Sequence, residues 1–468
     1  MKALVLAIES HIYETAVLSK ALEVRGVKTL NLICGGGFKR CELSKFEIRG
    51  QMSSKERKGL CSHHQMQYQA LKNLYLPFIE INKFMKEEII TLLKEWRMGK
   101  RIWDYKEMSY DSLNLFEIVR PTVCWVLKSD IIEDRQDNLN ITFDYMKQAV
   151  LFIEIFREVY KRLRPDVVII FSGMILRERI AYELAHRHGI RTITWEKGLS
   201  TKTYRFDDQG FAVLSERAER EYERNRDKTL TSKEREELRS FLYKRSKREN
   251  IKTPTLPPFH NTQPKDVRTA LNIPNDKKIA TLFTTVSWDT GQITRRMIHK
   301  SILDWLSQTI EIFRENSEYY LVIRIHPGEA TKGERVPIIK RLEGIILPEN
   351  VVVIPPENLI DSYTLMDISN FGIVSVSTAG LEMVLRRRPV VCAGAAHYSR
   401  KGFTYDPKNE RDYRELLNSL MRNPVISEEM FRKAEVYAHY FFVNSLFLFL
   451  VPWMRPMKAV FVIYQYSY

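Results

Sequence analysis

The sequence has few cysteines, and they lack the regular spacing of a disulfide framework. Its cysteines are Cys34, Cys41, Cys61, Cys124 and Cys392. An odd number without a repeated interval indicates free thiols, and a chain of 468 residues can bury a core without disulfide staples. We therefore expect a protein of a reducing compartment, the cytoplasm. Cys61-Ser62-His63-His64 resembles part of a metal site, but no second pair stands at zinc-finger spacing.

Long apolar runs are also missing. The run after Met1 is short and ends at Glu9, so it predicts a buried first strand rather than a signal peptide. The stretch from Tyr440 to Met454 carries no charge, yet it is shorter than the roughly 20 residues that span a bilayer. We expect a core helix there. The alternative is an interfacial helix flanked by Arg455 and Lys458, lying at the inner face of the membrane.

Acidic residues are outnumbered by basic ones. Lys and Arg number 73 and Asp and Glu 58, which gives a net charge of +15. This balance favours anionic partners, among them nucleic acid, a membrane face and phosphorylated substrates. No RNA- or DNA-binding motif is present, and the basic residues are interspersed with acidic ones, so we expect no nucleic-acid partner.

Alternating strand and helix patterns in the first half predict an α/β domain. Strands are expected at 3–8, 27–34, 167–171 and 190–195, and the apolar run Val167–Phe171 is typical of a parallel strand covered on both faces. The segment 65–160 has mostly helical periodicity, which predicts a helical insertion. We place this N-terminal, acceptor-side domain at 1–260.

The pattern restarts after a proline-bearing segment, 253–263, which we interpret as an interdomain linker. Before it, 215–250 is dense in charge and predicts a solvated helix. After it, strands are expected at 278–284, 319–325, 351–354, 373–376 and 389–392, separated by helical segments. The prediction is an α/β fold of two domains facing a cleft, with a C-terminal domain at 261–430 and a helix with an apolar tail at 431–468.

Polar residues follow two strands of this second unit, where open parallel sheets bind ligands. One group is Arg324, His326, Pro327 and Glu329. Proline stops regular pairing and leaves the imidazole at the sheet edge, where it can meet a phosphate or a ribose. A ligand-free loop histidine is the alternative interpretation.

The second group is Ser377, Thr378, Gly380 and Glu382. A helix N-terminus and two hydroxyls can bind phosphate, and Glu382 can bind ribose hydroxyls. A plain capping box is the alternative. The loop after the next strand carries His397 and Tyr398 and is a candidate to close over a donor sugar.

These motifs resemble those of the bacterial capsular polysaccharide biosynthesis glycosyltransferases. Arg324 to Glu329, Ser377 to Glu382 and His397 to Thr404 carry the resemblance, which covers about 275–450 well and the first half thinly. The family is similar to the capsule Kdo transferases and the bacterial polysialyltransferases. The resemblance implies a GT-B-like fold of two Rossmann-like domains, with no metal and no cofactor, and a nucleotide-sugar bound to the C-terminal domain. His326 would then contact donor phosphate, and Ser377 and Thr378 phosphate or ribose.

Two motifs are absent. No Asp-x-Asp triplet is present, and Gly35-Gly36-Gly37 is not the dinucleotide-binding Gly-x-Gly-x-x-Gly. We therefore expect basic side chains and backbone N–H groups, rather than a metal, to stabilise a leaving phosphate. The candidate bases for an acceptor hydroxyl are Glu9, Glu196 and Asp289, each with a capping or ion-pair role as the alternative.

The function expected is transfer of a sugar to a surface or capsular polysaccharide or a lipid-linked glycan. Three alternatives remain open at this point. They are a UDP-sugar 2-epimerase, which would release nucleotide without an acceptor, a CDP-glycerol-type glycerophosphotransferase and a non-enzymatic anion-binding protein.

Overall fold

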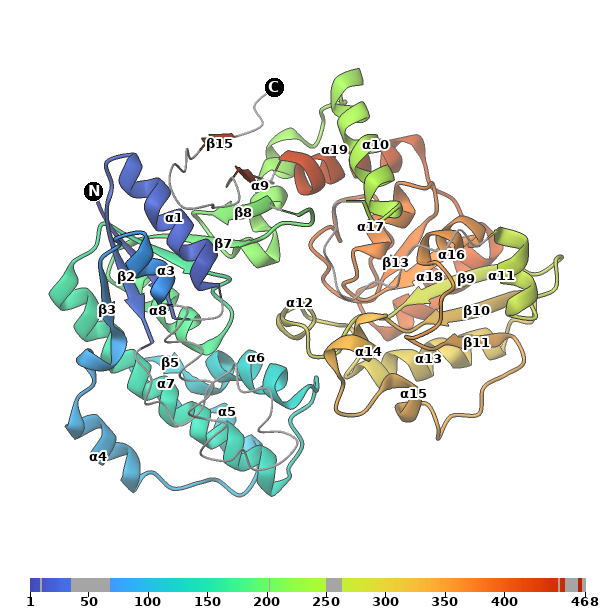
Figure 1. The fold of residues 1–468 in the computed structure, drawn as a ribbon. Helices are drawn as coiled ribbons and strands as arrows, with labels where there is room; N and C mark the ends of the chain where they lie inside the picture. The colour runs from blue at the N-terminus through green and yellow to red at the C-terminus, as the bar shows by residue number, and fades with distance from the viewer. Residues whose placement is uncertain are drawn as a thin grey trace.

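Two α/β domains lie side by side in the computed structural model, the N-terminal one in blue to green and the C-terminal one in yellow to red (Figure 1). The structure describes residues 1–8, 11–34, 68–201, 203–249, 263–444, 447–450 and 462–464. Glu9, the three-glycine run, Cys61 to His64 and nearly all of the predicted linker lie outside these ranges.

An eight-stranded sheet forms the centre of the N-terminal domain, in the order β15-β14-β8-β7-β6-β1-β2-β3. Its strands are β1 (Lys2–Ala7), β2 (Lys28–Ile33), β3 (Phe78–Glu80), β6 (Val167–Phe171), β7 (Arg191–Lys197), β8 (Thr203–Asp207), β14 (Phe447–Leu450) and β15 (Val462–Tyr464). The strands from β3 to β7 are parallel to their neighbours, and β8, β14 and β15 pair antiparallel.

Helices cover both faces of this sheet, as its continuously apolar strands require. One face packs against α6 (Leu115–Leu127), α7 (Gln136–Leu163) and α8 (Leu176–Arg187). The other packs against α1 (Ile12–Val24) and α3 (Gln69–Asn73). The shorter elements are η1 (Ile81–Phe84), α4 (Glu87–Glu95), α5 (Trp103–Lys106), β4 (Ser109–Tyr110) and β5 (Leu113–Asn114). The expectation of mostly helix over 65–160 misses β3, whose three residues are too few to show a strand period.

The C-terminal domain contains a five-stranded parallel sheet in the order β11-β10-β9-β12-β13. Its strands are β9 (Lys278–Phe283), β10 (Tyr319–Arg324), β11 (Val351–Ile354), β12 (Phe371–Val374) and β13 (Val390–Cys392). Both domains therefore share one central strand order, in which the first strand lies between the second and the fourth. This is the doubly wound, Rossmann-like arrangement, and the prediction of two such domains is confirmed.

Helices also cover both faces of the C-terminal sheet. One layer holds α13 (Ile302–Arg314), α15 (Ile338–Arg341) and α18 (Glu410–Arg422). The other holds α11 (Pro264–Ala270), α16 (Ser362–Ile368), α17 (Ala379–Val384) and α19 (Glu428–His439). Two short helices, α12 (Thr290–Thr294) and α14 (Gly328–Lys332), follow the carboxyl ends of β9 and β10.

The charged segment before the linker packs on the C-terminal domain. It forms α9 (Glu216–Asn225) and α10 (Ser232–Ser246), after the short η2 (Ala212–Leu214). Tyr222 and Leu238 of these helices are buried in one apolar cluster with Val267 and Tyr437. By packing, 216–246 thus belongs with the C-terminal core, although it falls within the predicted domain 1–260, because its buried apolar side chains all join that core.

The end of the chain returns to the N-terminal domain. After α19 and the π-helical turn Tyr440–Asn444, β14 pairs with β8 through Phe447 and Tyr204. The prediction of a core helix over 440–454 is therefore wrong at 447–450, where the apolar residues extend a sheet instead. Within the described ranges, no helix combines the length and apolar character needed to cross a membrane.

A second contact joins the domains on the side opposite these connections. The ammonium of Lys128 lies 4.3 Å from the ring centroid of Trp125 and 3.3 Å from that of Trp288, a cation–π arrangement across the domain boundary. Arg341 pairs with Asp130 at 2.8 Å and lies mostly buried. The two domains are thus joined both by the chain connections and by this contact.

Candidate active site

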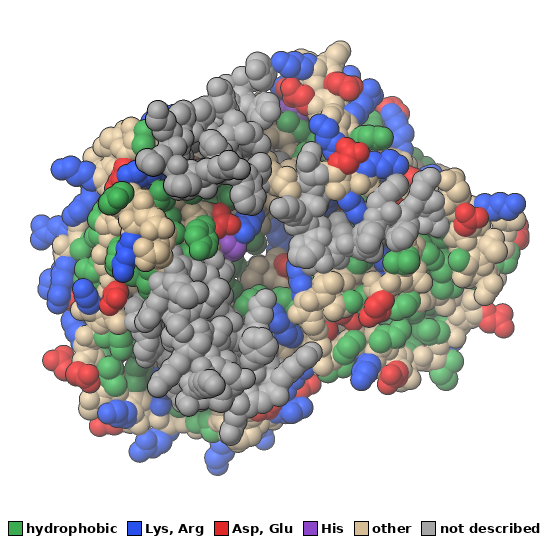
Figure 2. All heavy atoms as spheres, in the orientation of Figure 1, with side chains coloured by type: hydrophobic (Ala, Val, Ile, Leu, Met, Phe, Trp, Pro, Cys, Tyr) green, Lys and Arg blue, Asp and Glu red, His purple; other side chains and the backbone are tan. Residues whose placement is uncertain are grey.

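A cavity of about 400 Å³ lies between the two domains. It is lined at its centre by Thr284 and Thr285, which follow β9, and by Val376 and Ser377, which follow β12. β9 and β12 are adjacent strands, and from them the order of the following strands runs in opposite directions across the sheet. Open α/β sheets bind ligands at such a switch point. Figure 2 shows a hollow between the two halves of the molecule in this region.

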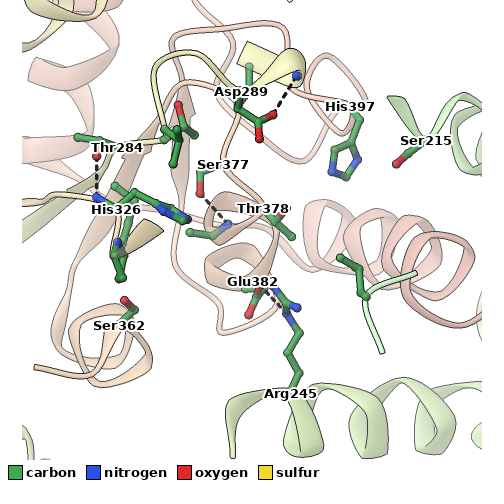
Figure 3. Close-up of a pocket in the computed structure, with 18 of the residues that line it drawn as sticks. Ser215, Arg245, Thr284, Asp289, His326, Ser362, Ser377, Thr378, Glu382 and His397 are labelled. Atoms are coloured by element: carbon green, nitrogen blue, oxygen red, sulfur yellow. Dashed lines mark hydrogen bonds and ion pairs between the residues drawn. The ribbon is translucent and has the colours of Figure 1, made fainter. Parts of the chain in front are cut away.

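Eight of the residues predicted from the sequence line this cavity. They are Asp289, Arg324, His326, Pro327, Ser377, Thr378, Glu382 and His397. Glu196, Glu329, Gly380 and Tyr398 do not line it, and Glu9 lies outside the described residues. Figure 3 shows that the labelled members come from several separate segments of the chain.

His326 is held rigidly at the end of β10. Its backbone N–H donates to Oγ1 of Thr284 at 2.9 Å, and its Nδ1 accepts from the backbone N–H of Gly328 at 2.9 Å (Figure 3). Burial, with the nearby charges of Lys332 and Arg324, lowers the pKa of His326 to about 4. The ring is therefore neutral at pH 7, and because Nδ1 accepts, its proton lies on Nε2. His326 can donate this proton to a ligand oxygen.

The loop after β12 presents two hydroxyls to the cavity. The backbone N–H of Ala379 donates to Oγ of Ser377 at 3.3 Å, which orients that side chain, and Thr378 lies beside it (Figure 3). The following helix α17 is only six residues long. A long helix dipole is therefore lacking here, and the polar groups that this loop offers to the cavity are the two hydroxyls.

Gly380 and Tyr398 support this loop from behind. The Tyr398 side chain is fully buried, and its hydroxyl donates to the backbone oxygen of Ser377. A Cβ at Gly380 would lie 2.2 Å from Oη of Tyr398. The absence of a side chain at Gly380 therefore makes room for Tyr398 rather than for a ligand.

A buried ion pair closes the lower end of the cavity as Figure 3 draws it. Nε of Arg245, on α10, donates to Glu382 at 3.0 Å, and both side chains are largely buried. Arg248 pairs with Asp361 at 2.8 Å in the same region. Glu382 thus has contacts within the protein, among them a side-chain hydrogen bond with Tyr363, and it also borders the cavity.

Arg324 and Glu329 have mainly structural contacts. The guanidinium of Arg324 donates to the backbone oxygens of Pro355 and Asn358, the second at 2.9 Å, although it also borders the cavity. Glu329 is buried and accepts from the backbone N–H of Ile338 at 2.9 Å. Its predicted role in substrate binding has no geometric support, because its carboxylate holds the 328–338 loop instead.

Of the two candidate bases in the described residues, Asp289 lines the cavity and Glu196 does not. The carboxylate of Asp289 caps α12 by accepting from the N–H of Gly291 at 2.9 Å (Figure 3). Glu196 lies at the end of β7, where burial is the main cause that raises its pKa to about 7, and the charge of Asp289 raises it further. A carboxylate with this pKa is suited to accept a proton at neutral pH.

Sequence reasoning missed most of the cations that line the cavity. The set comprises Arg205, Arg245, Arg248, Arg295 and Lys332. Arg205 lies on β8, Arg245 on α10 and Arg248 just after it, in a segment whose composition predicts a solvated helix. No local pattern marks these three, because they reach the cavity only through the packing of their segments on the second domain.

No group of three or more His, Cys, Asp and Glu side chains that could hold a metal ion occurs in the part of the chain that the structure describes. The Cys61 to His64 segment is not part of that search.

The fold and the site together define a protein with two Rossmann-like domains and, between them, a cavity whose lining is rich in Arg and Lys. Residues 261–435 match the model of the family described as capsule polysaccharide biosynthesis protein. The resemblance inferred from the His326-Pro327 and Ser377-to-Glu382 motifs is therefore confirmed over this part of the chain.

No curated protein matches the sequence. Among solved structures, the chain is similar to Thermosulfurimonas dismutans KpsC, a beta Kdo 2,4 transferase, with 14% identity, a TM-score of 0.39 and coverage of 61% of this chain and 81% of that one. It is also similar to UDP-GlcNAc 2-epimerase from Neisseria meningitidis bound to UDP-GlcNAc, with 13% identity, a TM-score of 0.30 and coverage of 95% and 97%.

Proposed function

We propose that this protein is a glycosyltransferase that moves a sugar from a nucleotide-sugar to a surface or capsular polysaccharide, or to a lipid-linked glycan. The observation that carries the proposal is the charge of the interdomain cavity. Its lining has six Arg and Lys side chains but only two carboxylates, those of Asp289 and Glu382. A nucleotide diphosphate is a ligand of matching size and charge.

The phosphates of the donor are assigned to the centre of the cavity. The Nε2–H of His326, the hydroxyls of Ser377 and Thr378 and the ammonium of Lys332 belong to lining residues of the segments that follow β10 and β12. Such fixed donors stabilise the charge that develops on a leaving phosphate, so the proposed reaction requires no metal. The ribose is assigned to the Glu382 end.

The base is assigned to Glu196. Its raised pKa leaves a large fraction of the carboxylate able to accept a proton from an acceptor hydroxyl near pH 7. Asp289 contributes by its charge and is otherwise occupied as a helix cap. Glu9 stays a prediction.

The proposal is tested by thermal unfolding with UDP, GDP, CDP and CMP, followed by an assay of nucleotide release from the matching sugar nucleotide. We expect one nucleotide to raise the unfolding temperature of the wild type and much less that of His326→Ala. The control is His186→Ala, whose ring contacts Thr192 and Tyr182 and does not line the cavity. Failure of every nucleotide to stabilise the wild type would contradict the proposal.

A further inference from the structure

A buried histidine at one end of the cavity has an unused ring nitrogen. His397 lines the cavity and is only 9% exposed. Its Nδ1 lies 2.7 Å from the hydroxyl oxygen of Tyr437, whereas Nε2 has no hydrogen-bond partner among the described residues. Buried polar atoms in native proteins are nearly always satisfied, so this nitrogen requires a partner other than the residues that the structure describes.

The contacts of Tyr437 determine which nitrogen of His397 carries the proton. The Tyr437 hydroxyl lies 2.8 Å from the backbone oxygen of His397 and donates its single proton there. Nδ1 must then donate to the Tyr437 oxygen, which leaves the lone pair of the neutral ring on Nε2. Burial, followed by the charges of Arg295, Arg205 and Lys401, lowers the pKa of His397 far below its ordinary value, so the ring is neutral.

A buried arginine beside His397 has an unused donor. Arg205 is 7% exposed and donates to Oγ of Ser215 at 3.0 Å and to the backbone oxygen of Phe441 at 3.4 Å, while its Nε has no partner among the described residues. The Phe441 ring joins the two groups, because its centroid lies 4.3 Å from the Arg205 guanidinium and 4.1 Å from the His397 ring. One end of the cavity thus offers both an acceptor and a donor.

We propose that this end, formed by His397, Tyr437 and Arg205, is the subsite for the transferred sugar, and that a sugar hydroxyl donates to Nε2 of His397 and accepts from Arg205. A hydroxyl is the group that both donates and accepts, whereas a phosphate ester oxygen that is ionised at neutral pH cannot donate to Nε2. The inference rests on the proposed function and assigns one part of the donor to one part of the site.

The position of this subsite is consistent with transfer. In Figure 3, His397 lies near Asp289 and Ser215, on the side of the cavity away from His326. Ser215 and Arg205 come from the segment that leads out of the N-terminal sheet. A sugar held here would be turned toward Glu196 and the N-terminal domain, and the phosphates would remain at His326.

The first test compares nucleotide with nucleotide-sugar binding by calorimetry. The probes are UDP with UDP-glucose and UDP-N-acetylglucosamine, GDP with GDP-mannose, and CMP with CMP-N-acetylneuraminate. In His397→Phe, which keeps a ring against Phe441, we expect the sugar nucleotide to bind about tenfold more weakly and the nucleotide within about twofold of the wild type. The control, His299→Phe, changes a buried histidine that does not line the cavity and should change neither affinity.

The outcomes separate this inference from the proposed function. If the wild type binds none of these nucleotides, the proposed function fails and the inference with it. If His397→Phe weakens the binding of nucleotide and sugar nucleotide equally, Nε2 contacts a phosphate. If it weakens the binding of neither, Nε2 contacts only water. Either result overturns the inference alone.

A second test needs no ligand and no variant at His397. Nitrogen-15 NMR of histidine-labelled protein reports which ring nitrogen is protonated, and we expect Nδ1 for His397. A proton on Nε2 would overturn the inference. Tyr437→Phe should remove the preference for a proton on Nδ1 of His397 and weaken sugar-nucleotide binding about threefold. The control is Tyr413→Phe, which removes a buried hydroxyl bonded to Trp305 at 3.0 Å and should have neither effect.

Discussion

The two domains share a strand order but differ at the carboxyl ends of their central strands. In the C-terminal domain, this edge presents Thr284, His326 and Ser377, and cations surround it. In the N-terminal domain, the edge is aromatic: the His11 ring lies 4.2 Å from that of Phe171, which lies 4.8 Å from that of Trp195. The same topology thus carries polar and cationic side chains at this edge in one domain and packed aromatic rings in the other, and the first is the better match to a phosphate.

The largest effect on turnover is expected for Glu196, at the carboxyl end of β7 in the N-terminal sheet. Glu196→Gln removes the proposed base, so turnover should fall by about 100-fold or more, with nucleotide affinity unchanged. Because the pKa of Glu196 is raised to about 7, wild-type turnover should fall as the pH drops below 7 and the carboxylate takes up a proton. Steady-state rates across pH check both points.

The matched control is Glu183→Gln, which removes a carboxylate that pairs with Arg179 at 2.7 Å and lies outside the cavity lining. It should leave the rate and the pH profile unchanged. Full activity in Glu196→Gln would transfer the role of base to Glu9 or Asp289.

A second prediction distinguishes cations that stabilise the fold from cations that are available to bind a ligand. Arg245→Met leaves the buried carboxylate of Glu382 without its ion-pair partner, which costs about 3 kcal/mol in the free energy of unfolding. Urea unfolding measures the change. The double variant with Glu382→Gln should recover part of it, and equal losses in single and double variants would contradict the pairing.

Much of the fold could be predicted from the sequence, because its signal is local. Val167–Phe171 and Val351–Ile354 are apolar runs bounded by turn residues, and both are strands with the predicted bounds. Strands with mixed character, such as β8, were missed, and β14 was read as a helix because an uncharged run fits either element.

The candidate site was predictable only in part, because sequence patterns report local structure and the site combines distant segments. His326 and Ser377 follow strands of one sheet, so topology brings them together. Arg205 and Arg245 reach the same cavity from distant segments, which no periodicity reveals. Gly380 belongs to the predicted substrate-binding group, but the sequence could not show that the Tyr398 side chain occupies the space beside it.

A third prediction follows from that contact. Gly380→Ala places a methyl group against the Tyr398 hydroxyl, which should destabilise the protein by about 2 kcal/mol and weaken nucleotide binding as the Ser377 loop shifts. Thermal unfolding and calorimetry measure the two effects. Gly344→Ala is the control, since nothing lies within 4 Å of a Cβ there; equal stability of both variants would contradict the packing argument.

The smallest effect is expected for a cation that makes no ion pair within the described residues. Lys332 lines the cavity, is exposed and has no ion pair within the described ranges. Lys332→Met should therefore leave the unfolding temperature unchanged and weaken nucleotide binding about tenfold, less so at high salt. Lys340→Met, on the neighbouring helix α15 and outside the cavity lining, should change neither quantity.

The central claim is that the C-terminal edge of the cavity binds the phosphates of a nucleotide. A crystal structure of the protein with the nucleotide that stabilises it most tests this directly. We expect a phosphate oxygen about 3 Å from Nε2 of His326, with the Ser377 hydroxyl bonded to the same phosphate. A nucleotide bound at the aromatic edge of the N-terminal sheet, or with its phosphates away from His326, would contradict it.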